Sequence, residues 1–368
     1  MKAGSWYRPP PHIGDLLGLL GDPAQASAMS MERWDVVVRT ARRLRLLATL
    51  GARLRACVQW QTVPAAVRAQ FDSALATARF RRQKVIYEMD AVRQALGDFH
   101  GPLILLKGAA YIAQDLEIAH HRVVGDLDLL VAREHLDEVE KRLLDKGWES
   151  LKPEAYDQHY YRAWSHELPP IQFPGHSLEV DLHHNILPPT GRVHPQAEML
   201  VAAAHLLPGT RFHVLHPADQ VLHAAVHLFQ DSDCLYRARD LVDLDSLLRT
   251  FAVESGFWDV LLRHAREHGL SRSLDYALDC ANAILRTPVP QSVQASLAPK
   301  GPSAVVRGIM RFLLPKALFT EHPEHPPDLG ELVARAALFL RAFWLRMPFF
   351  LLIRHSVSKL LRSLPPKP

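Results

Sequence analysis

The sequence predicts an α+β protein, in which a small α/β core is flanked by N-terminal and C-terminal helical regions. Apolar residues recur with helical spacing from the N-terminus to about Phe99, and again from Pro217 onward. Between these regions, short segments with two-residue alternation are separated by helical segments, as in strands that alternate with helices. We therefore expect a helical region at residues 1–98, a core at 99–190 and a helical domain at 191–368.

The N-terminal region is rich in arginine. Between Val36 and Val58, apolar residues are interleaved with Arg39, Arg42, Arg43, Arg45, Arg53 and Arg55. Pro64 suits the first turn of a following helix that continues through Val92. Two interpretations of the arginines stay open: a solvated helix face, or a surface that contacts phosphate or nucleic acid.

The core is predicted because the spacing of apolar residues changes from helical to a two-residue alternation. Its expected strands are Leu103–Leu106, Asp126–Val131 and Leu178–His183. Glu134–Lys146 lies between the second and third strands and has the pattern of an amphipathic helix, which Gly147 ends.

The C-terminal region is expected to be helical. Helical apolar spacing is found in Pro217–Phe229, Leu235–Leu248 and Val260–Ala281. The apolar stretch Ala336–Ile353 is interrupted by Arg341 and Arg346, and its longest uncharged run is seven residues, whereas a bilayer span needs about 20. We expect no transmembrane segment here. A buried terminal helix is the favoured interpretation, and an interfacial helix with peripheral membrane contact is the alternative.

The composition is that of a globular protein, with 48% hydrophobic and 22% charged residues in a chain of 368. The formal net charge of +4 favours an anionic partner, such as a nucleotide, a nucleic acid or an acidic lipid. The three cysteines lie far apart and form no CxxC pair, which argues against a disulfide framework or a zinc ribbon. We expect a cytoplasmic protein with a native N-terminus rather than a signal peptide.

Two acids on one predicted strand indicate a metal site. Asp126 and Asp128 are two residues apart and share a face of the strand, while Leu127 and Leu129 point to the other face. Two carboxylates side by side are costly unless a cation lies between them. Oxygen ligands of this kind suit Mg²⁺, which proteins bind with one or two carboxylates together with substrate phosphates.

The strand Leu178–His183 supplies a third carboxylate. Asp181 shares a strand face with Glu179 and His183. If this strand is next to the first one, Asp181 completes a cluster that can hold two divalent ions. Such ions can activate an attacking hydroxyl and stabilise leaving pyrophosphate, which fits phosphoryl or nucleotidyl transfer.

A phosphate-binding turn is predicted just upstream. Gly108 allows close approach of the backbone to a ligand, and the start of the following helix favours anions. Lys107 and Arg122 are placed to neutralise the charge of a triphosphate.

The segments LLKGAAYIAQ, HRVVGDLDLLV and LEVDLHHNIL resemble the bacterial uncharacterised nucleotidyltransferase family, a branch of the DNA polymerase β-like nucleotidyltransferase superfamily. The resemblance covers roughly Leu103–Leu187, with looser similarity at His223, His227 and Asp240. It implies a small mixed sheet, with the first two acids on one strand and the third on a neighbouring strand. It also implies Mg²⁺ or Mn²⁺ as cofactor and a nucleoside triphosphate, with ATP expected, as donor.

The residue roles that follow from this resemblance are of two kinds. Asp126, Asp128 and Asp181 are the expected catalytic and metal-binding residues. The expected nucleotide-binding residues are Lys107, Gly108, Arg122 and Gly125. One departure from the superfamily pattern is that Gly108-Ala109 replaces Gly-Ser or Gly-Gly, so phosphate binding must use backbone N–H groups and basic side chains.

The sequence leaves two possible roles open for several other side chains near the predicted site. Glu179 is a metal ligand, or a solvated or supporting acid. His183 and His184 position substrate or lie at the rim of the site. His223 and His227 share a helix face and could bind zinc, but a structural pair or a pair lining the cleft is favoured.

The favoured function is nucleotidyl transfer from a nucleoside triphosphate to an acceptor that the sequence does not name: a small molecule, a protein, a glycan or RNA. The alternative is a non-catalytic nucleotide-binding or scaffold protein with the same fold, or a peripheral membrane protein that uses the C-terminal apolar stretch.

Overall fold

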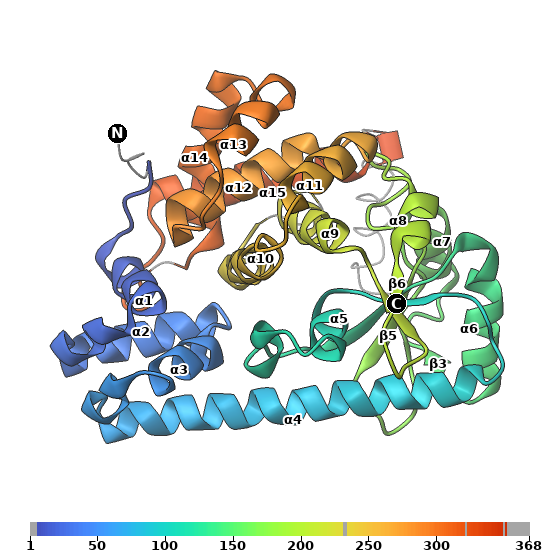
Figure 1. Cartoon of the computed structure of the whole chain (residues 1–368), viewed down its shortest axis with the longest axis horizontal. Coiled ribbons are helices and arrows are strands. Elements are labelled where there is room, and N and C mark those ends of the chain that lie inside the picture. Colours follow the sequence, from blue (N-terminus) through green and yellow to red (C-terminus); the bar gives the residue numbers. More distant parts are fainter. Residues whose placement is uncertain (1–5, 231–233, 321, 349, 352–368) are drawn as a thin grey trace, which may run out of the picture.

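The computed structural model describes residues 6–230, 234–320, 322–348 and 350–351. It confirms the α+β class, because helices form most of the molecule and flank one mixed sheet (Figure 1). The long helix α4 (Ala65–Leu96) runs along one side of the molecule, from the N-terminal helices to the region of the sheet. It therefore connects the two parts of the molecule that Figure 1 shows at opposite ends.

The N-terminal helices pack around one end of α4. They are α1 (Pro11–Gly21), η1 (Pro23–Ala28), α2 (Met31–Arg43), α3 (Leu47–Arg55) and η2 (Val58–Thr62). The arginine-rich pattern after Val36 is shared between α2 and α3 because the chain turns at Arg45, whose φ of 57° lies in the left-handed region. α3 lies very close to α4, since a Cβ on Gly51 would be 2.8 Å from the Cβ of Phe71.

The sheet has seven strands in the order β3-β4-β5-β2-β1-β7-β6. The strands are β1 (Leu103–Leu105), β2 (Asp126–Leu130), β3 (Glu149–Ser150), β4 (Ile171–Gln172), β5 (Glu179–His183), β6 (His205–Leu206) and β7 (Phe212–Val214). The three predicted strands are confirmed as β1, β2 and β5. β2 is parallel to β5 and antiparallel to β1, and β1 is parallel to β7, so the sheet is mixed.

The other four strands were not predicted, because two or three residues are too few to show an alternating pattern. Two of them, β6 and β7, come from beyond residue 190, where the helical domain was expected. The pairing of β7 with β1 brings this later segment into the same sheet. The proposed division at residues 98 and 190 stays a prediction.

Short helices connect the strands. They are α5 (Lys107–Ala113), η3 (Glu117–His120), η4 (Arg133–His135), α6 (Leu136–Asp145), α7 (Ala155–Trp164) and α8 (Ala197–Ala203). The predicted amphipathic helix is confirmed as α6, and Gly147 follows it with a φ of 101°, a conformation that glycine adopts without steric cost.

The C-terminal helices are α9 (Pro217–Phe229), α10 (Ala238–Phe251), α11 (Phe257–Glu267), α12 (Ser271–Leu285), α13 (Gln291–Leu297), η5 (Ala298–Lys300), α14 (Ala304–Leu318) and α15 (Leu329–Arg346). The predicted helix at Pro217–Phe229 is confirmed. The single segment Val260–Ala281 is two helices, because the chain turns at Gly269 with a φ of 70°.

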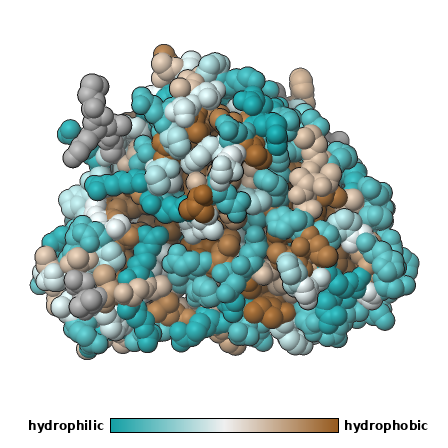
Figure 2. All heavy atoms as spheres, viewed as in Figure 1, coloured by the Kyte–Doolittle hydropathy of each residue, from teal (hydrophilic) through white to brown (hydrophobic). Residues whose placement is uncertain are grey.

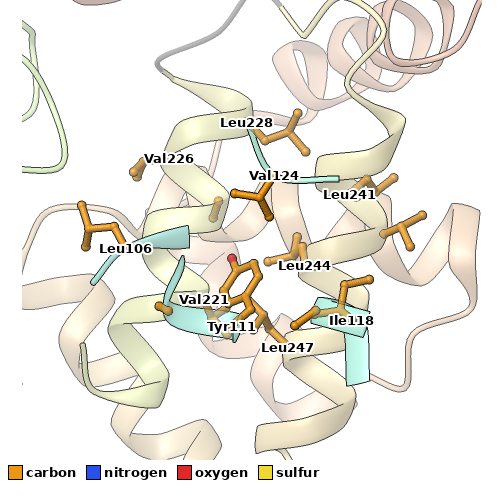
Figure 3. Packing of buried hydrophobic residues seen from close by; sticks show 14 of the residues in the cluster. Leu106, Tyr111, Ile118, Val124, Val221, Val226, Leu228, Leu241, Leu244 and Leu247 are labelled. Atoms are coloured by element: carbon orange, nitrogen blue, oxygen red, sulfur yellow. The ribbon is translucent and has the colours of Figure 1, made fainter. Parts of the chain in front are cut away.

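A buried apolar cluster packs the C-terminal helices α9 and α10 against α5 and the segment that leads into β2. Tyr111 of α5 lies among Val221 of α9 and Leu244 and Leu247 of α10, and all of them are buried (Figure 3). Val124, which leads into β2, belongs to the same core. Close packing of this kind holds the ends of β1 and β2 in place, and the predicted site residues lie there.

The expectation of a buried terminal helix is only partly right for α15. The helix begins with a capping box formed by Asp328 and Glu331. Its buried residues form one stripe, while Leu340 and Trp344 are 68% and 51% exposed, because α15 packs mainly on one neighbour, α14. Residues 349, 352 and 353 of the predicted apolar stretch lie outside the described residues.

None of the described helices is long and apolar enough to cross a bilayer. On the face of the molecule shown in Figure 2, apolar side chains are interspersed with hydrophilic ones. Contact with a membrane surface stays a prediction.

Candidate active site

Three carboxylates converge at the centre of the sheet. Asp126 and Asp128 lie on β2 and Asp181 lies on β5, and the parallel register places Asp128 opposite Asp181. One carboxylate oxygen of each residue lies within 4.8 Å of the other two. The predicted convergence is therefore confirmed, since paired strands place side chains of one face next to each other. Glu179 pairs with Asp126 in the register, but it is exposed and does not belong to this group.

These carboxylates repel one another when no cation lies between them. The charge of Asp128, together with burial, raises the pKa of Asp126. Burial, together with the charges of Asp128 and Glu167, raises the pKa of Asp181 to about 8. Both shifts indicate an excess of negative charge that a bound cation would relieve. Hard oxygen atoms at this spacing suit Mg²⁺ or Mn²⁺.

Asp128 has two further partners on one of its oxygens. Lys107 Nζ and His183 Nε2 lie 3.2 Å and 2.9 Å from Asp128 Oδ1. Burial opposes ionisation, but Lys107 and His183 outweigh it and hold the pKa of Asp128 well below its ordinary value. His183 is completely buried and His184 is 6% exposed, so the interpretation that they lie at a rim is wrong. His183 instead orients a candidate metal ligand, as supporting residues do in metal sites.

The first turn of α5 has an unusual backbone. Lys107 has a φ of 44°, in the region that few residues other than glycine adopt, and such strain is often found at functional sites. Gly108 follows it, and a Cβ there would lie 2.5 Å from Arg122 Nη1 and 2.8 Å from both methyl groups of Val124. Glycine is therefore required for packing. Its predicted approach to a ligand stays a prediction.

The buried side chain of Arg122 lies next to Gly108 and forms an ion pair within the protein. Its Nε donates a hydrogen bond to Asp243 Oδ2 at 2.6 Å, and both side chains are buried. Burial opposes the charge, yet Asp243 raises the pKa of Arg122 above its ordinary value. A guanidinium held in this way supports the first turn of α5, and its contact with a triphosphate stays a prediction.

A cavity of about 660 Å³ opens beside the carboxylates. Asp126, Asp128, Lys107, Arg122 and Gly125 all line it. Five further arginines complete the lining, together with polar and apolar residues from distant segments, and the lining is strongly basic apart from the two acids. An adjoining basic surface of this kind attracts phosphate groups.

Asp240 fixes two of these arginines, Arg237 and Arg239. Its carboxylate accepts hydrogen bonds from both guanidinium groups, at 3.1 Å to Arg237 Nη1 and 3.1 Å to Arg239 Nη2. Burial, together with the charge of Arg122, lowers the pKa of Arg239, and the charges of Asp240 and Asp243 oppose this shift. Sequence reasoning noted Asp240 but missed the two arginines, although the R-x-R-D spacing at the start of α10 was visible.

Arginines from the N-terminal region also line the cavity. Arg42 and Arg45 belong to the lining, whereas Arg55 pairs with Asp72 on the surface. A solvated face is therefore favoured for Arg55, whereas contact of Arg42 and Arg45 with phosphate stays a prediction.

The two histidines of α9 give no support to a zinc site. His227 lines the cavity and His223 is 3% exposed. Burial, together with the charge of Lys107, lowers the pKa of both well below the ordinary value, so both are neutral. In the part of the chain that the structure describes, neither belongs to a group of three possible ligands. Sequence reasoning also missed Glu167, which lies 3.5 Å from His183 Nε2.

Two acids on one strand of a mixed sheet and a third on its parallel neighbour, beside a basic cavity, define a nucleotidyltransferase type of protein. The chain belongs to the family described as uncharacterised nucleotidyltransferase, whose model matches residues 30–286. This segment begins before the arginine-rich helices and ends after α12, so it includes every lining residue of the cavity. A search of curated proteins found no match to the chain.

Proposed function

We propose that the protein transfers a nucleoside monophosphate from a nucleoside triphosphate to an acceptor hydroxyl, with Mg²⁺ or Mn²⁺ as cofactor and ATP as donor. The observation that carries this proposal is the strand register that sets Asp128 opposite Asp181, next to Asp126, at a basic cavity. Family membership supports the same class of reaction.

The three carboxylates fit a pair of divalent ions. They offer hard oxygen atoms within 4.8 Å of one another, and burial together with the charges of Asp128 and Glu167 raises the pKa of Asp181, which a bound cation would lower. Asp126, Asp128 and Asp181 would hold the ions. When bound, the ions polarise the α-phosphate and lower the pKa of the acceptor hydroxyl.

The chain's own cationic groups bind the donor. Lys107 lies next to Asp128, and Arg237 and Arg239 line the cavity beside Gly125 and Asp126. Charge-assisted hydrogen bonds from these groups neutralise the triphosphate and orient its α-phosphorus. Gly125, which has no atom within 4 Å of the position of a Cβ, leaves room for the donor next to the acids.

Asp181 then acts as the base. It accepts the proton of the acceptor hydroxyl while that oxygen forms a bond to the α-phosphorus. The bond between the α-phosphorus and the oxygen bridging to the β-phosphorus breaks, and pyrophosphate leaves with the electron pair. The products are a nucleotidylated acceptor and pyrophosphate.

The position of a radioactive label tests this reaction. The purified protein is incubated with Mg²⁺ or Mn²⁺, cell extract and ATP labelled on the α-phosphate or on the γ-phosphate. Nucleotidyl transfer places the α-label on the acceptor and the γ-label on pyrophosphate. A γ-labelled acceptor would contradict the proposal. Binding of ATP without any labelled acceptor would instead support the non-catalytic nucleotide-binding alternative.

A further inference from the structure

Three arginines form a separate wall of the cavity. Arg42 lies in the last turn of α2, Arg45 at the turn between α2 and α3, and Arg81 in the middle of α4. All three line the same cavity as Asp126 and Asp128. We call these three residues the arginine wall. They come from the N-terminal helices, whereas the carboxylates come from the sheet.

The arginine wall differs from the other basic residues of the cavity in its partners. Lys107 pairs with Asp128, Arg122 pairs with Asp243, and Arg237 and Arg239 pair with Asp240. Among the residues that the structure describes, Arg42, Arg45 and Arg81 form no ion pair with a carboxylate. The side chain of Arg42 instead donates a hydrogen bond to a neutral group, Gln70 Oε1, at 2.5 Å.

Three like charges facing one cavity repel one another unless an anion lies between them. Arg45 is the residue that follows the C-cap of α2, and its φ of 57° is the left-handed conformation in which helices commonly end. The charge arrangement therefore indicates an anionic ligand at the arginine wall.

Neutral polar groups accompany the arginine wall along α4. Gln70, Ser73 and Thr77 line the cavity on the same helix face as Arg81, at helical spacing. Guanidinium groups bind the oxygens of a phosphate with paired hydrogen bonds, and hydroxyl and amide groups complete its coordination. Such a combination is well suited to a phosphate group on a larger molecule that also carries hydroxyls.

We propose that the arginine wall binds the acceptor, and that the acceptor is a small molecule with a phosphate group. This inference rests on the proposed function, since it assigns the donor to the carboxylates, Lys107, Arg237 and Arg239. The remaining cationic groups then face the other substrate. The cavity volume of about 660 Å³ is in the range of small-molecule sites, which favours a small acceptor over a nucleic acid.

The test compares two double variants of equal charge. Arg45→Gln/Arg81→Gln removes two members of the arginine wall. Arg79→Gln/Arg266→Gln removes two exposed arginines that are not among the lining residues of the cavity. Circular dichroism and thermal unfolding check that both variants are folded.

The measurement is calorimetric titration in two steps. The first ligand is Mn²⁺ with an ATP analogue that has a methylene group between the α- and β-phosphates. The second is glycerol 3-phosphate, added to the nucleotide complex, with glycerol as the probe that lacks phosphate. We expect Arg45→Gln/Arg81→Gln to weaken glycerol 3-phosphate binding about tenfold or more, because each lost contact is a charge-assisted hydrogen bond. The control variant should bind as the wild type does, and the nucleotide affinity should be the same in all three proteins.

Several results would overturn the inference. Loss of nucleotide affinity in Arg45→Gln/Arg81→Gln would assign the arginine wall to the donor. Equal binding of glycerol 3-phosphate by all three proteins, or no binding by the wild type, would remove its role as a phosphate site. Binding of a ten-nucleotide RNA that depends on Arg45 and Arg81, without binding of glycerol 3-phosphate, would indicate a nucleic-acid acceptor.

The failure of the proposed function gives a different result. A wild type that binds glycerol 3-phosphate in the absence of nucleotide, but does not bind the Mn²⁺–nucleotide, would contradict nucleotidyl transfer while supporting an anion site at the arginine wall. A wild type that binds the Mn²⁺–nucleotide but not glycerol 3-phosphate would contradict only the inference about the acceptor.

Discussion

The two sides of the cavity hold their charges in different ways. On the side of the sheet, the cationic groups have carboxylate partners within the protein, as Lys107 has in Asp128 and Arg122 has in Asp243. On the side of the N-terminal helices, Arg42, Arg45 and Arg81 have no carboxylate partner among the described residues. The paired groups are positioned before any ligand binds, and the unpaired ones lack a counter-charge that a ligand can supply. The first arrangement suits a catalytic centre, where geometry must be preorganised, and the second suits a binding surface.

The largest expected effect tests the side of the sheet. Asp128→Asn removes a charge from the predicted metal site, so we expect nucleotidyl transfer to fall about a hundredfold or more, since a metal ion contributes several kcal/mol to such a reaction. The matched control is Glu179→Gln, which changes an exposed acid on the same face of β5, outside the three-carboxylate group. Transfer rates are measured with α-labelled ATP. Equal losses in both variants would mean that the effect comes from general surface charge.

The second prediction concerns the buried pair that supports the sheet side. Asp243→Ala leaves the buried Arg122 without its partner, so we expect the free energy of unfolding to fall by about 3–5 kcal/mol. Urea denaturation measures this change. The comparison is Asp72→Ala, which breaks the exposed pair with Arg55 and should cost about 0–1 kcal/mol. Similar losses in the two variants would show that Arg122 does not depend on Asp243.

A smaller effect is expected at the turn. Gly108→Ala introduces a methyl group 2.5 Å from Arg122 Nη1 and 2.8 Å from the methyl groups of Val124, and we expect it to destabilise the fold by about 1–3 kcal/mol. Gly125→Ala meets no atom within 4 Å and should change stability by less than about 0.5 kcal/mol. Gly125 lines the cavity, so its substitution should affect nucleotide affinity instead. Urea denaturation and nucleotide titration of both variants separate the packing role of Gly108 from the nucleotide-binding role of Gly125. A larger loss of stability in Gly125→Ala than in Gly108→Ala would contradict this assignment.

The last prediction is a pH dependence of stability in the presence of a chelator. Burial and nearby negative charges raise the pKa of Asp181 from 3.8 to about 8, so the folded protein keeps a proton that the unfolded chain loses near its ordinary pKa. The free energy of unfolding should therefore fall as pH rises from about 4 to about 8. Asp181→Asn does not titrate and should show a weaker decline. Unfolding measured at pH 5 and pH 8 with EDTA checks this, and parallel declines would assign the pH dependence to other groups.

Much of the sheet side was predictable from local sequence. The alternation around Asp126, Asp128 and Asp181 showed which side chains share a strand face, and the structure confirms that these strands are neighbours. The short strands β6 and β7 were not predictable, because their two or three residues acquire strand structure only by pairing. The histidines were similarly ambiguous, since burial of His183 depends on what packs over the sheet.

The helical side could not be predicted in the same way. Arg42, Arg45 and Arg81 are separated from Asp126 by at least 45 residues of sequence, and nothing in their local pattern distinguishes them from Arg55, which lies on the surface. The ion pair of Arg122 could not be predicted either. Its partner Asp243 lies more than a hundred residues later in the sequence, yet Asp243 Oδ2 is 2.6 Å from Arg122 Nε.

The sequence by itself determined the class of fold, the three acids and the strand faces on which they lie, because the period of a strand is a local property that a few residues display. Only the tertiary structure decided which of the arginines face the acids and which of them are already paired inside the protein. These contacts join segments far apart in the chain, and they arise because α4 packs on β2 while α9 and α10 pack on α5 and η3.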